Sequence, residues 1–238
     1  MRMRLTCLII LFILTIPLFS FATEPLSKKS NGVGYHVNKN FDVVPNTPES
    51  PTKVVLLTID DGPSKYSNDM MSVLKKHNAK AIFFVNGLHD KGNPEIIKSM
   101  ARAGFTVGNH TWSHTNLKKI KREETVQKEI NDNSKLILEA TGANPKFFRS
   151  PFGVGTPYVR EIVKKEGMIY MNWSGAAKDW EKNTKDEKIF MKNIMTDLHP
   201  GEILLLHEHA WTSHYLDHLL TTLEEKGYTF IDPTLITY

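Results

Sequence analysis

The sequence predicts an α/β fold, a closed or nearly closed (β/α) barrel of about seven parallel strands. Short apolar runs alternate with helix-like segments from Lys53 onward, which is typical of a parallel sheet covered by helices. Glycines follow the helix-like segments, as in ARAGF and KKEGM, where helices commonly end. The 238 residues also suffice for one core of this size.

The seven candidate strands are apolar runs bounded by polar or turn-forming residues. They are VVLLTI (54–59), AIFFVN (81–86), FTVGNH (105–110), KFFR (146–149), MIYMNW (168–173), EILLLH (202–207) and YTFID (228–232). The segments between them are expected to contain the helices. The clearest helix lies near the C-terminus, where leucines recur at i, i+3, i+4 and i+7 before a closing glycine (Leu216, Leu219, Leu220, Leu223 and Gly227).

The N-terminal end has the pattern of a secretory signal peptide over residues 1–22. The basic MRMR precedes an apolar stretch from Leu5 to Phe21 and a small-x-small triplet at 20–22. We therefore expect a protein that is secreted, periplasmic or held in the cell envelope, with no stable membrane span after cleavage. An uncleaved anchor is the alternative, although Pro17 interrupts the stretch and leaves it short for a span.

The rest of the chain divides into two parts by composition. Residues 23–52 are rich in Ser, Lys, Asn and Pro and predict a linker or irregular segment, whereas 53–238 predict the folded domain. Cys7 is the only cysteine, so the exported chain would hold no disulfide. The net charge is +4, with basic and acidic residues interspersed, which argues against a nucleic-acid interface.

Polar side chains collect where the predicted strands end. The carboxyl ends of parallel strands meet on one rim, so these side chains should lie near one another. They are Asp60, Asp61, His110, His114, Arg149, Asp179, Trp180 and His207. Carboxylates, imidazoles and a guanidinium on one rim indicate a catalytic or metal-binding site.

The stretch HTWSH suggests part of a metal site. His110 and His114 are spaced i, i+4, so one helical turn would place both imidazoles on the same side. With one carboxylate they would form a three-ligand set that leaves a position open for water. Zinc suits this set, and cobalt, manganese or nickel could take its place. His214 and His218 have the same spacing on the C-terminal helix, and we expect them to be surface residues.

The adjacent aspartates suggest a division of labour. One would bind the metal, and the other would accept a proton from water beside it. The turn at Gly62 and Pro63 could direct both side chains to the same site on the rim, although an ordinary acidic turn has the same composition. His207 ends an apolar strand and could be a general acid or a structural histidine.

Five motifs in this order, TIDDGP, HTWSH, RSPFG, KDW and LLLH, resemble the polysaccharide deacetylase family, the carbohydrate esterases of family 4 with a NodB homology domain. The resemblance covers Lys53 to Tyr238. It implies a distorted (β/α) barrel and a hydrolase that acts on acetylated polysaccharide with a bound divalent metal.

The resemblance also implies a role for each matching residue. Asp60 matches the catalytic base, and Arg149 matches the residue that holds it. The metal ligands would be Asp61, His110 and His114, and the general acid would be His207. The substrate would meet the backbone N–H of Phe152, the acetyl pocket at Leu205, and the groove formed by Trp180 with Asp179.

The chain departs from the family pattern at three positions. The fourth motif usually reads D-x-x-D-W, but Ala176 stands at its first aspartate, which we expect to be the partner of the acid histidine. Glu208 stands where Asp is frequent, and Ile59 where Phe is usual. The expected partner of His207 is therefore missing at this position, and another carboxylate would have to reach His207 in its place.

The expected function is removal of N-acetyl groups from an N-acetylhexosamine glycan, with peptidoglycan first and chitin-like polymers next. Two alternatives stay open at this point. One is an O-acetyl esterase acting on xylan or a similar polymer, because the metal site would look alike. The other is a weakly active carbohydrate-binding module, which Ala176 suggests.

Overall fold

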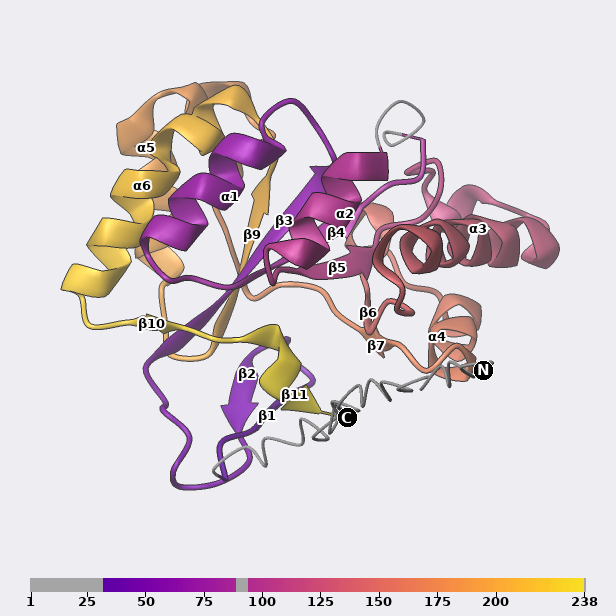
Figure 1. Cartoon of the computed structure of the whole chain (residues 1–238), viewed down its shortest axis with the longest axis horizontal. Coiled ribbons are helices and arrows are strands. Elements are labelled where there is room, and N and C mark those ends of the chain that lie inside the picture. The colour runs from indigo at the N-terminus through magenta and orange to yellow at the C-terminus, as the bar shows by residue number, and fades with distance from the viewer. Residues whose placement is uncertain (1–31, 89–93, 238) are drawn as a thin grey trace, which may run out of the picture.

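The computed structural model describes residues 32–88 and 94–237. Its main sheet follows the path β7-β6-β5-β4-β3-β9-β8, and every pair along this path is parallel. Among these residues the outermost strands, β7 and β8, are not paired with each other, so the barrel stays open between them. This confirms the predicted α/β fold, a distorted barrel of seven parallel strands (Figure 1).

Each predicted strand has a counterpart in the structure. The seven are β3 (Val54–Gly62), β4 (Ala81–Val85), β5 (Thr106–Asn109), β6 (Phe147–Phe148), β7 (Ile169–Tyr170), β9 (Glu202–His207) and β10 (Thr229–Phe230). β10 pairs with the first residues of β3 and lies off the main path. The seventh strand of the path is instead β8 (Gly175–Ala176), whose two residues were too few to predict.

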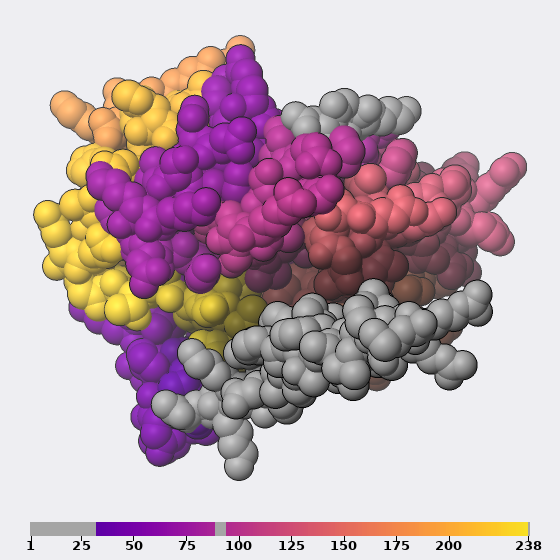
Figure 2. Space-filling model, viewed as in Figure 1, coloured from indigo at the N-terminus to yellow at the C-terminus, as the bar shows by residue number. Residues whose placement is uncertain are grey.

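Six α-helices accompany the described strands: α1 (Ser67–Lys76), α2 (Pro94–Arg102), α3 (Glu123–Thr141), α4 (Pro157–Lys165), α5 (Glu187–Asp197) and α6 (Ala210–Glu225). α6 is the helix predicted from the leucine pattern, and all four of its leucines are buried. In the space-filling view the side chains of α1 and α2 hide the strands behind them (Figure 2).

Alternation along β3 separates two parts of the core. Val55, Leu57 and Ile59 pack with α1 and α6 on the helix side of the sheet. Val54 and Leu56 point the other way, into the barrel. Because side chains alternate along a strand, the polar residues Thr58 and Asp60 continue the inward set. The pleat of β3 thus directs one carboxylate into the barrel.

A small sheet closes the amino ends of the strands, opposite the functional rim. It consists of β1 (Tyr35–Val37), β2 (Val43–Pro45) and β11 (Ile236–Thr237) (Figure 1). Tyr35, Val43 and Ile236 are buried in the barrel core. The prediction of irregular structure is therefore wrong for this part of 23–52, because these few apolar side chains fill the barrel end.

The predicted signal peptide lies outside the described residues. Within 32–88 and 94–237, none of the helices combines the length and the apolar character needed to cross a membrane.

Candidate functional site

The residues predicted for the rim do come together at the carboxyl ends of the strands. Asp60 and Asp61 lie at the end of β3, and His207 ends β9. His110 follows β5, and Arg149 follows β6. Side-chain nitrogens and oxygens of three pairs lie within 4 Å of each other: His110 with Asp60, His110 with Asp61, and Arg149 with Asp60.

A bulge in β3 explains how two consecutive aspartates face the same site. Pairing with β4 shifts register between Asp60 and Gly62, which leaves Asp61 as the extra residue. Asp61 has a φ of 67°, in the left-handed region. A regular strand would point Asp61 towards the helices, but the bulge turns its carboxylate to the rim. The redirection therefore begins at Asp61 itself, one residue before the predicted turn at Gly62.

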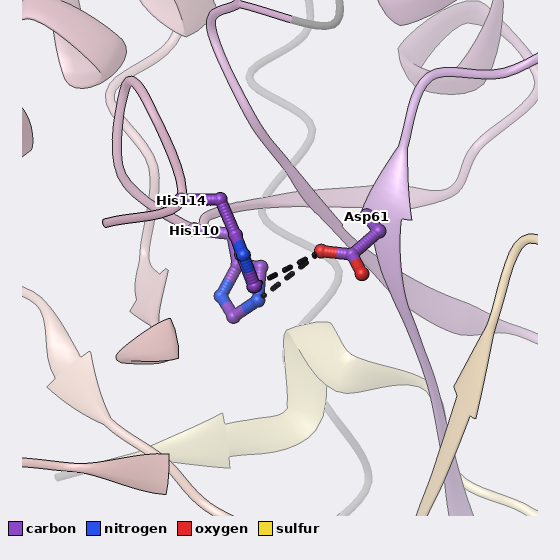
Figure 3. Close-up of side chains that lie close together, drawn as sticks. All are labelled: Asp61, His110 and His114. Atoms are coloured by element: carbon purple, nitrogen blue, oxygen red, sulfur yellow. Dashed lines mark ion pairs between the residues drawn. The ribbon is translucent and has the colours of Figure 1, made fainter. Parts of the chain in front are cut away.

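Asp61, His110 and His114 form a three-ligand cluster (Figure 3). Oδ1 of Asp61 lies 3.6 Å from Nε2 of His110 and 3.3 Å from Nε2 of His114. In a tetrahedral site with metal–ligand bonds of about 2.0–2.1 Å, two ligand atoms lie about 3.3 Å apart. The donor set and its spacing therefore fit a divalent metal.

The segment that carries the two histidines is a loop, so the expected helical turn is wrong. Residues 110–116 have no helical assignment, and Thr111 and His114 both have positive φ values, 69° and 55°. The imidazole rings nevertheless lie 5.0 Å apart. The left-handed backbone of this short loop therefore brings the two imidazoles together, as a helical turn would have done.

His110 is oriented by a contact outside the ligand cluster. Its Nδ1 lies 2.7 Å from the backbone carbonyl of Arg149, which accepts a hydrogen bond from it and leaves Nε2 to face Asp61. Burial lowers the pKa of His110 to about 3, so the imidazole is neutral, as a metal ligand must be.

Asp60 is buried next to Arg149. Nη1 of Arg149 donates to Oδ1 of Asp60 at 2.8 Å and to Oγ1 of Thr58 at 2.8 Å. The other carboxylate oxygen of Asp60 lies 3.6 Å from Nε2 of His110. Burial raises the pKa of Asp60, while the charges of Arg149 and His207 oppose this effect. One oxygen is thus held by the guanidinium, and the other borders the ligand cluster.

His207 has a carboxylate partner, and it is Asp179. Oδ1 of Asp179 lies 2.7 Å from Nδ1 of His207, and Oδ2 accepts from the His207 backbone N–H at 2.7 Å. Burial lowers the pKa of His207, but the hydrogen bond and charge of Asp179 outweigh it and raise this pKa to about 9.

This contact decides which carboxylate serves His207, and it corrects the predicted role of Asp179. The partner of His207 is not lost with Ala176, because the second aspartate of the motif supplies it. Asp179 is also not a surface of the substrate groove, since it is fully buried and Thr212 donates to its Oδ2 at 2.8 Å.

Two large aromatic side chains are exposed beside the site. Phe152, with a φ of 60°, is 61% exposed, and its ring lies 4.9 Å from that of His114. Trp180 is 50% exposed, and it meets His207 edge-on at 5.5 Å. Leu205 is buried in β9. His214 and His218 are exposed on α6, as predicted.

Several polar residues around the site were missed from the sequence. Thr58 and the backbone carbonyl of Asn172 accept hydrogen bonds from Arg149. Glu129 and Glu208 hold the loops that carry the metal-ligand cluster. Thr58 had a usable signal, because it lies two residues before Asp60 on the same face of a strand, and Glu208 stands out in the sequence only as a departure from the family pattern.

Comparison with known proteins gives the same family that the sequence motifs resemble. The polysaccharide deacetylase family model matches residues 47–171. The peptidoglycan-N-acetylmuramic acid deacetylase PdaA of Bacillus subtilis is 34% identical over 75% of this chain and 69% of its own length. The peptidoglycan-N-acetylglucosamine deacetylase PgdA of Listeria monocytogenes is 35% identical over 79% of this chain, which spans 40% of the PgdA length.

Comparison with solved structures indicates the same family as these sequence relatives. A pseudoenzyme of carbohydrate esterase family 4 from Bacillus anthracis superimposes with a TM-score of 0.71 and 29% identity, covering 77% of this chain and 64% of that one. The matched motifs, the barrel and the Asp–His–His cluster lead to one conclusion: the chain belongs to the polysaccharide deacetylase family.

Proposed function

We propose that this protein is a metal-dependent N-deacetylase that acts on N-acetylhexosamine residues of a polysaccharide, with cell-wall peptidoglycan as the first substrate. The observation that carries the proposal is the position of Asp60. It lies beside the Asp61–His110–His114 cluster without belonging to it, and Arg149 holds it there. A base next to a metal site is the arrangement that hydrolysis by activated water requires.

Asp61, His110 and His114 would hold the metal, for which we propose zinc because two imidazoles and one carboxylate suit it. A bound dication would polarise the substrate carbonyl and lower the pKa of water at the site.

Asp60 would accept the proton of the attacking water. Its Oδ1 is already occupied by Arg149, so Oδ2, on the side of His110, is the oxygen available for this transfer. Arg149 makes Asp60 a fixed acceptor, because the guanidinium is buried and also tied to Thr58 and the Asn172 carbonyl. The role of Arg149 would be to position the base.

His207 would give a proton to the departing amine nitrogen. Asp179 accepts a hydrogen bond from Nδ1 of His207, so Nε2 of His207 is the atom directed to the reacting groups. A pKa of about 9 keeps the ring protonated at neutral pH, which is the form that a general acid needs. The backbone N–H of Phe152 would donate to the oxyanion, and Leu205 would contact the acetyl methyl group.

The exposed rings of Trp180 and Phe152 support a sugar substrate, because saccharide faces stack on aromatic side chains. Peptidoglycan is favoured by the names of the relatives, PdaA and PgdA, and by the N-terminal signal pattern, which would place the protein at the cell wall.

Two other functions remain as candidates. An O-acetyl esterase would use the same residues, because ester hydrolysis and amide hydrolysis both pass through a tetrahedral oxyanion. A weakly active carbohydrate-binding module is the second, and it is kept because a structurally similar protein of carbohydrate esterase family 4 is a pseudoenzyme.

One assay separates the three. The purified protein, loaded with zinc, is incubated with peptidoglycan, acetylated chitooligosaccharide and acetylxylan, and both acetate and free amine are measured. Acetate and amine in equal amounts support the N-deacetylase. Acetate without amine supports the esterase, and glycan binding without acetate supports the binding module.

A further inference from the structure

The two loops that carry the metal-ligand cluster are each tied down by a glutamate from another element. Glu208, which follows β9, reaches the loop after Asp61. Glu129, in the middle of α3, reaches the loop between His110 and His114. Neither glutamate belongs to the ligand cluster.

Each glutamate accepts hydrogen bonds from both the backbone N–H and the Oγ of one serine. Glu208 accepts from the backbone N–H of Ser64 at 2.9 Å and from its Oγ at 2.5 Å, both at Oε2. Glu129 accepts from the backbone N–H of Ser113 at 2.8 Å and from its Oγ at 2.7 Å, at its two oxygens. We call these contacts the Glu208–Ser64 clamp and the Glu129–Ser113 clamp.

Further contacts strengthen each clamp. Glu208 is almost fully buried, also accepts from Oγ of Ser67 in the first turn of α1, and donates its backbone N–H to the carbonyl of Asp60. A side chain on Gly62 would collide with Oε1 of Glu208, so the loop packs directly on the carboxylate. In the second loop, Trp112 donates its backbone N–H to the carbonyl of Glu129 at 2.9 Å.

The loops need such support because their backbones are unfavourable on their own. Asp61, Thr111 and His114 all have positive φ values and are not glycines. Such conformations cost free energy and persist only where surrounding contacts hold them. Each clamp lies within three residues of a ligand, so it acts on the strained part of the loop.

We propose that Glu208 and Glu129 are positioning residues that preorganise the metal site and thereby set its affinity. This inference rests on the proposed metal dependence and goes beyond it by assigning the affinity to two residues that do not touch the metal. Groups that hydrogen-bond directly to metal ligands commonly contribute a factor of about 10–100 to affinity, and the two glutamates hold the backbone that carries the ligands. We expect a loss of that size when either clamp is removed.

The test is titration of the metal-free protein with Zn²⁺ and Co²⁺ by calorimetry, in Glu208→Ala and Glu129→Ala. Each should bind both ions about 10- to 100-fold more weakly than the unsubstituted protein. The cobalt absorption spectrum should also change, because the ligands are less well held. Matched controls are Glu139→Ala on α3 and Glu225→Ala on α6, both at exposed positions, which should leave affinity unchanged.

Glutamine variants distinguish hydrogen bonding from charge. Both Ser64 bonds end on a single oxygen of Glu208, which an amide oxygen can replace, so Glu208→Gln should keep affinity within a few-fold. Ser113 Oγ can accept from an amide as well as donate, so Glu129→Gln should behave likewise. In a double-mutant cycle, Ser64→Ala should add little to Glu208→Ala, because Glu208→Ala already removes the acceptor of the Ser64 Oγ bond.

Four outcomes decide the question. Weak binding in folded alanine variants with rescue by glutamine supports the clamps. Unchanged affinity in the folded alanine variants overturns them while leaving the proposed function intact. Loss of affinity in the glutamine variants as well assigns the effect to charge and also overturns the clamps. Absence of metal binding by the unsubstituted protein overturns both the clamps and the proposed function. Circular dichroism and thermal melts of the metal-free variants establish folding, and Ser64→Ala or Ser113→Ala replaces any variant that unfolds.

Discussion

The carboxylate of Asp179 holds His207 at two points, with Oδ1 2.7 Å from the ring Nδ1 and Oδ2 2.7 Å from the backbone nitrogen. Oδ2 also accepts from Thr212 at the start of α6, and the Asp179 carbonyl accepts from the indole N–H of Trp211 at 3.0 Å. The orientation and the charge of the proposed acid therefore depend on one buried side chain.

Asp179→Asn should lower kcat by roughly a factor of 100 or more, because it removes the charge that keeps His207 protonated. His207 has a pKa of about 9, raised from 6.5, so the acid form is present at neutral pH and is lost as pH rises through about 9. Without the carboxylate, the basic limb of the pH–rate profile should shift to lower pH. Profiles of kcat measured with a soluble acetylated chitooligosaccharide test this. Asp132→Asn, at a surface ion pair, is the control, and an unshifted limb in Asp179→Asn would contradict the assignment.

Ala176→Asp should not increase activity. The position looks like a lost catalytic partner in the sequence, but the ring Nδ1 and the backbone nitrogen of His207 are already bound by Asp179. A second carboxylate near a buried one adds repulsion. We expect kcat/KM to stay equal or to fall, and an increase of several-fold would show that Asp179 does not satisfy His207.

Asp60→Ala should abolish turnover and keep the metal, because Asp60 lies outside the ligand cluster. It also leaves Arg149 buried without its charge partner, which typically costs about 3–5 kcal/mol of folding stability. Acetate release, metal content by elemental analysis and thermal melts measure the three effects. His110→Ala should lose the metal, and turnover with it. Retention of full activity by Asp60→Ala would disprove its role as base, and full metal content in His110→Ala would remove that ligand.

Glu202→Gln should change how stability depends on pH. Glu202 is fully buried at the start of β9, and burial raises its pKa to about 7 from an ordinary value of 4.5. The folded state therefore binds the proton more tightly than the unfolded state, so the free energy of unfolding falls as pH rises from 4.5 to about 7. This effect amounts to roughly 3 kcal/mol and is absent in glutamine.

The measurement is urea unfolding of both proteins at several pH values between 4.5 and 8. The stability of Glu202→Gln relative to the unsubstituted protein should increase across this interval. Parallel curves would show that Glu202 titrates normally. Glu166→Gln, at an exposed position after α4, is the control and should follow the unsubstituted protein.

The strands were predictable because their apolar runs are long enough to be seen locally, as in Val54–Gly62 and Glu202–His207. The two-residue β8 and the strands of the small sheet were not, since Gly175–Ala176 and Tyr35–Val37 carry too few residues for a periodic signal. Their positions depend on pairing with β9 and β11, which are distant in the sequence.

The parallel α/β barrel and the residue types on its rim could be predicted from the sequence, because hydrophobic periodicity and motif spacing are local properties. The order of the strands in the sheet was not predicted. The sequence also pointed to Asp61, His110 and His114 as a cluster. How these side chains are held depends on contacts that form only when the chain folds. The bulge at Asp61, the left-handed loop of His114 and the contact of Asp179 with His207 across 28 residues all arise from packing between segments far apart in the chain. Such contacts leave no periodic trace in the sequence, so Asp179, Glu129 and Glu208 acquire their roles only in the folded protein.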